Sequence, residues 1–226
     1  MGVARLDAST ENLSPFEQRL AEGAVYLHQA DRLLAPIITR IGLLRMQLLG
    51  DYFGSLCSAI IGQQLSGKAA QAIEDRFMAL FSPERQFTAA NVAALSVEEL
   101  RTAGLSEAKA RYLRDLAERV DSGALDLSHC ENMDDEEVIT RLVEVKGIGR
   151  WTAEMFLIFS LGRLDVLPVD DLGLRKAVMQ LYGLPHMPKR PDLEDLAGPW
   201  QPYRTVATLY LWRTLSPQED PAQTLE

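Results

Sequence analysis

The chain has 226 residues, 47% of them hydrophobic and 24% charged, which is typical of globular proteins that bury one or two apolar cores. Its two cysteines, Cys57 and Cys130, exclude a four-cysteine iron–sulfur cluster and fit a reducing cytosol. The formal net charge is −9, so any contact with nucleic acid is expected to depend on a local group of basic residues rather than on the charge of the whole chain.

The predicted secondary structure is helical along the whole chain. Apolar residues recur at spacings of three and four, and no segment alternates as a half-buried strand does. Residues 1–13 are expected to be a frayed leader, 84–95 a loose connection, and the segment after Pro217 a disordered tail. Capping residues, prolines and glycines predict helices over the following ranges: 15–29, from 31 onward, 51–64, 67–81, 96–103, 107–122, from 134, from 150, 172–182, 192–197 and 204–215.

Several of these helices have specific predicted caps, among them Ser14, Asp31, Ser106 and Asp134 at the start of each helix. Ser66 is placed to accept a first-turn N–H of the helix that follows it, and Asp192 to do the same for the short helix before Ala197. Ser96 and Glu99 have the spacing of a capping box.

The central motif is the stretch LVEVKGIGRWTAEMF, residues 142–156. A helical run precedes Gly147 and Gly149 and another follows them, so the two glycines are expected to form a turn with positive φ at both positions. The second helix begins with Arg150, and its free N–H groups and positive dipole end form a site for a phosphate. This pattern predicts a helix–hairpin–helix element that binds a nucleic-acid backbone, although a Gly-x-Gly turn can also simply close a pair of helices.

Two further motifs accompany the hairpin. The stretch LPVDDLGLRK, residues 167–176, places two aspartates before a helix, and IIGQQLSGKAA, residues 60–70, places two glutamines at a helix–helix junction. With these three motifs the chain resembles the helix–hairpin–helix base-excision DNA glycosylase superfamily, specifically its 3-methyladenine DNA glycosylase II branch, over roughly residues 51–213. The resemblance implies an all-α fold with two helical lobes that flank a DNA-binding cleft.

The resemblance also implies how the chain is divided. Residues 1–50 would be N-terminal helices that pack on the C-terminal lobe, and residues 51–135 would be a helical lobe with an intercalating loop. Residues 136–226 would be the lobe that holds the helix–hairpin–helix and a catalytic aspartate.

The two adjacent aspartates are the candidates for catalysis. Cleavage of a base from deoxyribose builds positive charge on the sugar, which one carboxylate can stabilise. From the residues alone, Asp170 and Asp171 could both be N-terminal helix residues. The resemblance assigns catalysis to Asp171, while Asp170 would support the loop or cap the helix.

The resemblance further outlines a base pocket. Some relatives also nick the strand with a lysine, at a position that is Trp151 here, so a Schiff base is not expected. Trp151, Tyr203 and Met155 match positions that line the pocket, together with Asp170. A core aromatic residue is the alternative reading of Trp151.

Several residues are expected to contact DNA. The resemblance implies that the loop from Gln63 to Ser66 lies in the minor groove and that Gln64 fills the gap left by a flipped base. The alternative is that this loop is only a polar junction between two helices. The proposed contacts also include Lys109, although its residue type and helical position favour the alternative of a solvated helix face. The full predicted set is Gln63, Gln64, Leu65, Ser66, Lys109, Gly147, Gly149, Arg150 and Thr152.

The only metal that the resemblance implies is a structural Na⁺ or K⁺. The family binds such a cation through backbone carbonyls of the hairpin, which match Val143, Val145 and Ile148 here. No cofactor is expected to be required for the reaction.

The resemblance implies a monofunctional DNA glycosylase that flips alkylated purines of the 3-methyladenine or 7-methylguanine type out of duplex DNA and hydrolyses their N-glycosidic bond. Two alternatives remain: a non-catalytic DNA-binding module, or a glycosylase for deaminated or oxidised bases. The expected partner is double-stranded DNA with a damaged base, without a membrane, and the expected state is a monomer in the cytoplasm, such as a bacterial cytosol or nucleoid. The longest apolar runs are too short to span a bilayer.

Overall fold

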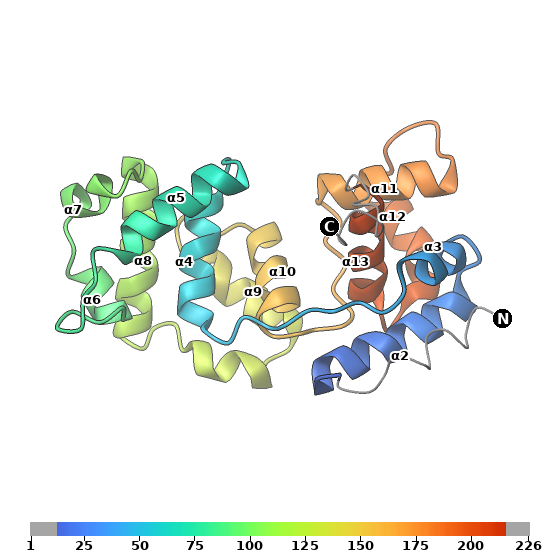
Figure 1. Cartoon of the computed structure of the whole chain (residues 1–226), viewed down its shortest axis with the longest axis horizontal. Helices are drawn as coiled ribbons and strands as arrows, with labels where there is room; N and C mark the ends of the chain where they lie inside the picture. Colours follow the sequence, from blue (N-terminus) through green and yellow to red (C-terminus); the bar gives the residue numbers. More distant parts are fainter. Residues whose placement is uncertain (1–12, 216–226) are drawn as a thin grey trace, which may run out of the picture. The chain divides into compact units, whose positions relative to one another are not determined.

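The computed structural model describes residues 13–215, and every regular element in that range is a helix. The all-α prediction is therefore confirmed for this range, while the expected leader and tail lie mostly or wholly outside it. The chain forms two compact units (Figure 1): unit 1 comprises the chain up to Leu48 and from Gly162 onward, and unit 2 comprises Leu49–Leu161. None of the helices in the described range is long and apolar enough to cross a membrane.

Unit 2 is a continuous segment whose helices begin at side-chain caps. Asp51, Ser106 and Asp134 each accept a backbone N–H from the first turn that follows, and Ser96 with Glu99 forms the predicted capping box. The elements are α4 (Tyr52–Gly62), α5 (Gly67–Met78), α6 (Ala89–Ala93), α7 (Val97–Thr102), α8 (Glu107–Asp121), η1 (Leu127–Asn132), α9 (Asp135–Val143) and α10 (Arg150–Phe159).

Helix α8 is central to the packing of unit 2. It buries Ala110, Leu113, Leu116 and Ala117, whose spacing of three and four places them on one face, and it packs against α4, α6 and α7. Helix α10 packs against α9 and α4. The hairpin is thus joined to α4 through its second helix, α10.

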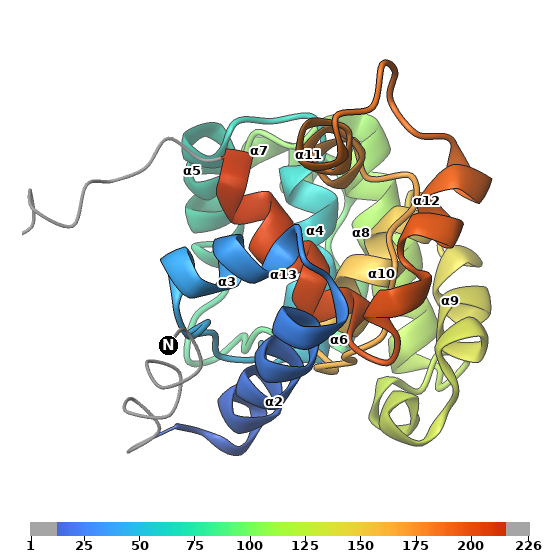
Figure 2. The same ribbon diagram turned by 90° about the vertical axis from the view of Figure 1, so that its right-hand side faces the viewer.

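Unit 1 is built from both ends of the described chain. Residues 205–211 of its last helix are all buried, which is typical of a helix surrounded on every side. The elements of unit 1 are α2 (Pro15–Ala30), α3 (Leu34–Ile41), α11 (Leu172–Tyr182), α12 (Arg190–Leu196), η2 (Gly198–Trp200) and α13 (Arg204–Leu215). The last helix, α13, packs against α2, α3 and α11, and Figure 2 shows α2 and α3 beside it.

A buried carboxylate ties these segments of unit 1 together. Asp31 is 9% exposed and accepts hydrogen bonds from the backbone N–H of Leu33 at 2.8 Å and of Leu34 at 3.2 Å. It also accepts from the indole Nε1 of Trp200 at 2.8 Å and from the hydroxyl of Tyr182. Burial alone would raise the pKa of Asp31, but these donors outweigh burial and lower that pKa below its ordinary value.

The division into units differs from the sequence-based expectation. A boundary was expected at residue 135, with the hairpin in the C-terminal lobe, whereas the hairpin helices belong to unit 2 and the boundary follows Leu161. The physical reason is packing, since α10 contacts α4 within unit 2. The acidic segment around residue 135 does not reveal whether the hairpin helices pack with the helices before them or with those after them.

The other differences between the predicted and the observed secondary structure concern single short helices. The connection at 84–95 contains the short helix α6, and the segment after α8 contains the 3₁₀ helix η1. The helix expected from Asp192 begins two residues earlier, because Asp192 lies inside its first turn and accepts the N–H of Lys189 at 3.0 Å. The predicted helices 172–182 and 204–215 are confirmed residue for residue.

Candidate functional site

The hairpin turn between α9 and α10 requires one glycine in an unusual conformation, not two. Gly147 has a φ of 86°, and the Ile148 N–H closes the turn onto the Val145 carbonyl at 3.1 Å. Gly149 has a φ of −93° and a ψ of 171°, so the expectation of positive φ at both glycines is wrong. Gly149 is the residue that precedes the first residue of α10, and residues at that position adopt extended backbone.

The side chain of Tyr112 lies directly against this turn. A Cβ added to Gly147 would lie 2.1 Å from the Cδ2 atom and 2.5 Å from the Cγ atom of Tyr112. The glycine at 147 therefore serves a close approach as well as a positive φ. One turn further along α8, the Asp115 carboxylate accepts the backbone N–H of Lys146 at 2.9 Å.

Arg150 is held by carboxylates of its own unit. Its guanidinium forms a two-pronged pair with Glu136, one contact of which is 2.9 Å, and its Nε lies 3.1 Å from Oε1 of the buried Glu154. The hydrogen bond to Glu136, followed by the attraction of both carboxylates, raises the pKa of Arg150. Two negative charges therefore already balance its positive charge, and the predicted phosphate contact of Arg150 stays a prediction.

The first turns of α10 place three predicted residues in different surroundings. Trp151 is 45% exposed, whereas Thr152 is 6% exposed, so any contact of Thr152 with DNA must come from its backbone. Thr152 and Met155 line an apolar cavity of about 220 Å³ between α10 and α4. The other lining residues are Leu49, Ser55, Leu56, Ser58, Ala59, Phe156, Phe159 and Ser160.

The predicted intercalating loop joins α4 to α5. Gln64 is exposed and has a φ of 57°, and Leu65 is 38% exposed. Ser66 occupies the capping position of α5, but its side chain makes no capping hydrogen bond, so that predicted cap is wrong. Ser66 is exposed.

The structure brings this loop and the hairpin together. The side-chain amide of Gln63 donates from Nε2 to the Gly147 carbonyl at 2.8 Å. Two motifs that are far apart in the sequence therefore meet within unit 2. Nothing in the residue pattern around Gln63 indicated this contact.

Lys109 belongs to the same loop system. Its Nζ donates to the backbone carbonyls of Ile61 and Gln63, both at 2.7 Å, and burial lowers the pKa of Lys109. The reading of Lys109 as part of a solvated helix face is therefore wrong. The contact of Lys109 with a phosphate stays a prediction.

The two aspartates of the motif at residues 167–176 have different surroundings. Asp171 begins α11: its Oδ1 accepts the backbone N–H of Leu174 at 2.6 Å and the indole Nε1 of Trp212 at 2.8 Å. Asp170 is 61% exposed at its side chain and pairs with Arg190 at 2.9 Å. One carboxylate is thus oriented by fixed donors from α11 and α13, and the other is held by a flexible surface arginine.

Trp212 is a functional candidate that no sequence motif indicated. Its indole approaches Asp171 over Gly173, where an added Cβ would lie 3.1 Å from Asp171 Oδ1 and 3.4 Å from the Trp212 ring. A glycine near the start of a helix is a weak sign of such close packing. No spacing in the sequence relates the last helix to residue 171.

Tyr203, the other predicted wall of the base pocket, packs within unit 1. Its ring lies 5.3 Å from the ring of Tyr26, measured between centroids, and a Cβ at Gly23 would lie 2.8 Å from its Cδ1 atom. The N-terminal helix α2 therefore supports the position of Tyr203. Tyr203 stays partly exposed.

The hairpin carbonyls have the right chemistry for a monovalent cation. Val143 ends α9, where carbonyls lack helical partners, and the Val145 carbonyl accepts one N–H, from Ile148, and keeps a second lone pair. Together with the Ile148 carbonyl they form a set of neutral oxygen donors, which hard cations favour. Within residues 13–215, no group of three or more His, Cys, Asp or Glu side chains could hold a metal ion.

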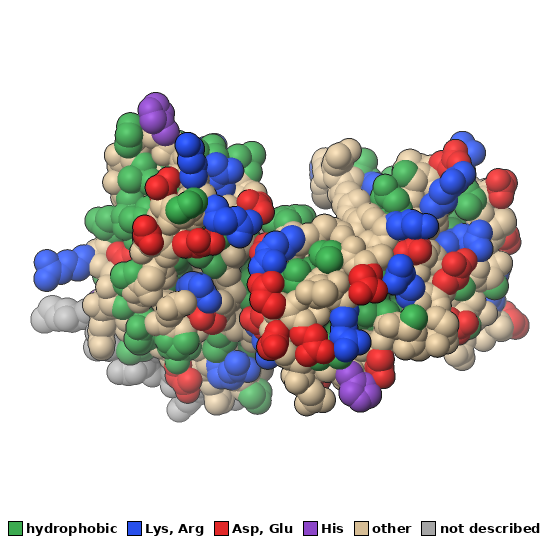
Figure 3. All heavy atoms as spheres, turned by 180° about the vertical axis from the view of Figure 1, so that it is seen from behind, with side chains coloured by type: hydrophobic (Ala, Val, Ile, Leu, Met, Phe, Trp, Pro, Cys, Tyr) green, Lys and Arg blue, Asp and Glu red, His purple; other side chains and the backbone are tan. Residues whose placement is uncertain are grey.

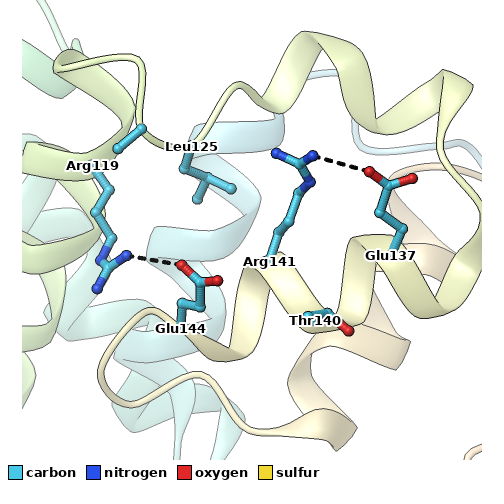
Figure 4. A pocket seen from close by; sticks show the side chains of 7 residues that line it. Arg119, Leu125, Glu137, Thr140, Arg141 and Glu144 are labelled. Carbon is cyan, nitrogen blue, oxygen red and sulfur yellow. Dashed lines mark hydrogen bonds and ion pairs between the residues drawn. The ribbon is translucent and has the colours of Figure 1, made fainter.

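A separate polar pocket of about 300 Å³ lies between the end of α8 and α9 (Figure 4). Ion pairs connect its charged residues: Arg119 with Glu144 at 3.4 Å and Arg141 with Glu137 at 3.0 Å. It contains none of the predicted site residues. On the face drawn in Figure 3, basic and acidic side chains are likewise interspersed, so the basic residues form no continuous patch there.

Comparison with known proteins gives consistent matches. A family model described as HhH-GPD superfamily base excision DNA repair protein matches residues 57–202, which include the hairpin, the Gln63–Ser66 loop and both aspartates. DNA-3-methyladenine glycosylase 1 of Schizosaccharomyces pombe is 39% identical over 163 residues, which are 72% of this chain and 72% of that protein.

Solved structures agree. A 3-methyladenine DNA glycosylase of the same yeast, in complex with abasic DNA, matches with a TM-score of 0.77 and 34% identity over 85% of this chain and 96% of that chain. A DNA-3-methyladenine glycosidase from Bacillus halodurans matches with a TM-score of 0.75 and 40% identity over 89% of both chains. The chain therefore belongs to the HhH-GPD superfamily of base excision DNA repair proteins.

Proposed function

We propose that the protein is a monofunctional DNA glycosylase that hydrolyses the N-glycosidic bond of alkylated purines in duplex DNA and leaves an abasic site. Two observations support this: similar proteins are named DNA-3-methyladenine glycosylase or glycosidase, and Asp171 is a carboxylate in a fixed orientation at the start of α11. The damaged base would leave the stack before cleavage, because the bond to be broken is not accessible inside a duplex.

The orientation of Asp171 is the single observation that carries the proposed chemistry. Loss of the base develops positive charge on the deoxyribose, and an ionised carboxylate beside the anomeric carbon stabilises that charge or activates the attacking water. Both donors to Oδ1 are rigid, one a backbone N–H and the other an indole N–H, so the carboxylate does not need to reorganise during the reaction. Asp170 would keep its loop in place through Arg190.

The absence of strand cleavage is part of the proposal. A lyase reaction at this kind of site needs an amine that forms a Schiff base with the sugar, and the matching position is Trp151, whose indole nitrogen is not nucleophilic. Borohydride is therefore expected to trap no covalent adduct between the protein and DNA. Strand breaks should appear only after alkali has cleaved the abasic product.

Cationic bases are the proposed substrates. Methylation at N3 of adenine or N7 of guanine gives the base a positive charge, so it leaves without a proton from the enzyme. Trp151 and Tyr203 each carry an aromatic face, and a cation over such a face gains about 0.5–2 kcal/mol depending on desolvation. No histidine occurs in the three motifs that could protonate a neutral base.

DNA would be bound by backbone N–H groups of the hairpin and by the loop that carries Gln64. The free N–H groups at the start of α10 would bind a phosphate, and Gln64 would enter the duplex from the minor groove. A monovalent cation bound by the carbonyls of Val143, Val145 and Ile148 would stabilise the hairpin backbone. The proposed enzyme acts as a monomer.

A panel of duplexes, each with one lesion, tests the proposal. The protein is incubated with duplexes that contain 3-methyladenine, 7-methylguanine, ethenoadenine, uracil or 8-oxoguanine, and alkali then reveals abasic sites. The methylpurines are expected to be released well ahead of the neutral lesions. Equal release of uracil or 8-oxoguanine would refute the substrate class, and no release at all would leave a DNA-binding module.

The matched pair of aspartates tests the mechanism. Asp171→Asn should lower single-turnover base release by on the order of 10²–10³ while the protein stays folded and binds DNA. Asp170→Asn, which keeps the loop sequence and loses only a surface ion pair, should retain most activity. The opposite result would show that the catalytic carboxylate is Asp170.

A further inference from the structure

The loop that carries Gln64 is a strained turn. Among the described residues, Gln64 is the one non-glycine with positive φ, at 57°, and the N–H of Leu65 closes the turn onto the Gly62 carbonyl at 3.2 Å. Gln63 has a φ of −52° and a ψ of 130°. These are the angles of a type II turn, whose third residue is ordinarily glycine or asparagine, so glutamine at this position needs support from its surroundings.

Lys109 provides that support at a specific atom. Type I and type II turns differ mainly by a rotation of the central peptide unit, which here joins Gln63 to Gln64. The Lys109 ammonium donates to the carbonyl of this central peptide at 2.7 Å, and therefore favours the orientation of a type II turn. Its second hydrogen bond, to the Ile61 carbonyl at 2.7 Å, anchors the ammonium at the negative end of α4.

The same face of α8 also holds the hairpin. Lys109, Tyr112 and Asp115 follow one another at intervals of three, and they contact the Gln63 carbonyl, Gly147 and the N–H of Lys146 respectively. The Gln63 side chain adds a direct bond from the loop to the Gly147 carbonyl. Helix α8 thus fixes the distance between the two loops that are proposed to meet DNA.

We propose that Lys109 is a positioning residue, which holds Gln64 in the left-handed conformation from which it enters the duplex. This rests on the proposed function. An ammonium has three N–H donors, and two of them are occupied, one by the Ile61 carbonyl at the end of α4 and one by the Gln63 carbonyl of the loop. Lys109 acts on DNA through Gln64, and its charge does not neutralise a phosphate.

The test compares Lys109→Met with Arg111→Met. Methionine keeps the length of the lysine stem and removes the ammonium, and Arg111 is an exposed residue on the same helix whose removal costs one positive charge without touching the loop. Crystal structures of both variants report the turn directly. In Lys109→Met the peptide between residues 63 and 64 is expected to rotate, with φ of Gln64 becoming negative, while Arg111→Met keeps the type II turn.

Kinetics and salt dependence give the functional readout. Lys109→Met is expected to lower single-turnover release of 7-methylguanine by about 10- to 100-fold, the effect of losing charged hydrogen bonds. The double variant Lys109→Met, Gln64→Ala should release the base no more slowly than Gln64→Ala alone, because Lys109 acts only through Gln64. The slope of log affinity against log salt, measured on a duplex with an abasic site, should equal that of Arg111→Met.

Two results would overturn the inference. One is a salt slope that falls by about 0.9 in Lys109→Met but not in Arg111→Met, because this is the signature of a lost phosphate contact. The other is an unchanged turn in the crystal structure of Lys109→Met. Failure of the proposed function gives a different result. In that case the wild-type protein releases no methylated base, while the turn still rotates in Lys109→Met.

Discussion

Replacing Gly147 by alanine should destabilise the protein by about 2–5 kcal/mol, which is a large part of the ~5–15 kcal/mol that stabilises a typical protein. One contribution is the backbone, because a φ of 86° costs a residue with a Cβ roughly 1–2 kcal/mol. The other is overpacking of about 1–3 kcal/mol, since the new Cβ would lie 2.1 Å from Cδ2 and 2.5 Å from Cγ of Tyr112. The Cγ atom is the root of the ring, so rotation of the ring about its own axis does not relieve the clash.

The hairpin contains its own control. Gly149 has a φ of −93° and no atom within 4 Å of an added Cβ, so Gly149→Ala should cost at most about 1 kcal/mol, the value of a weaker helix cap. A second control separates the two contributions. In a Tyr112→Ala background the clash disappears, and Gly147→Ala should then cost only about 1–2 kcal/mol.

Thermal unfolding followed by circular dichroism measures the difference. At about 2–4 °C per kcal/mol for a chain of this size, Gly147→Ala should lower Tm by roughly 4–20 °C and Gly149→Ala by no more than about 4 °C. Affinity for a duplex with an abasic site, measured below both transitions, reports the hairpin itself. Equal losses of stability in the two variants would refute the argument, because they differ only in the conformation and surroundings described here.

Three further outcomes are expected. Trp212→Phe keeps an aromatic ring but removes a donor to Asp171, so kcat should fall by about 10- to 100-fold with little change in DNA affinity; an unchanged kcat would mean that the indole does not orient the carboxylate. Gln64→Ala should slow release from paired duplexes more than from mispaired ones, where unstacking costs less, and equal effects would indicate a purely structural loop. Because the pKa of Asp31 is lowered in the folded state, its ionised form stabilises the protein above pH ~4 and the benefit is lost as the pH falls below that value. Urea unfolding should therefore find Asp31→Asn less stable than wild type at pH 7, with a difference that shrinks below pH 4; a constant difference would exclude the ionised carboxylate as the cause.

The sequence predicted what depends on neighbouring residues. Caps such as Ser96 and Asp134 act within one turn, so the starts of α7 and α9 could be located from residue types alone. The type of motif at the hairpin was predictable for the same reason. The positive φ at Gly149 was predicted wrongly, because a glycine does not reveal whether it closes a turn or precedes a helix.

Contacts over long distances in the chain could not be predicted. The bond from Trp212 to Asp171, and the bonds from Lys109 to the loop after α4, join residues more than 40 positions apart. Exposure of a lysine or a tryptophan depends on which helices pack against it, and residue type does not fix that. Arg150 illustrates the same limit, since its charge is matched by Glu136 from the other hairpin helix.

The way in which unit 1 is assembled from both ends of the chain has a consequence for synthesis on the ribosome. Its helices α2 and α3 emerge early, but the helix that covers them, α13, begins only at Arg204. At ~5–20 residues per second, the apolar faces of α2 and α3 wait roughly 10–30 s for their partner. Unit 2 is continuous and can fold in that interval. A nascent chain that stops before Arg204 therefore lacks the helix against which both α2 and α3 pack, and part of their apolar surface stays open to solvent.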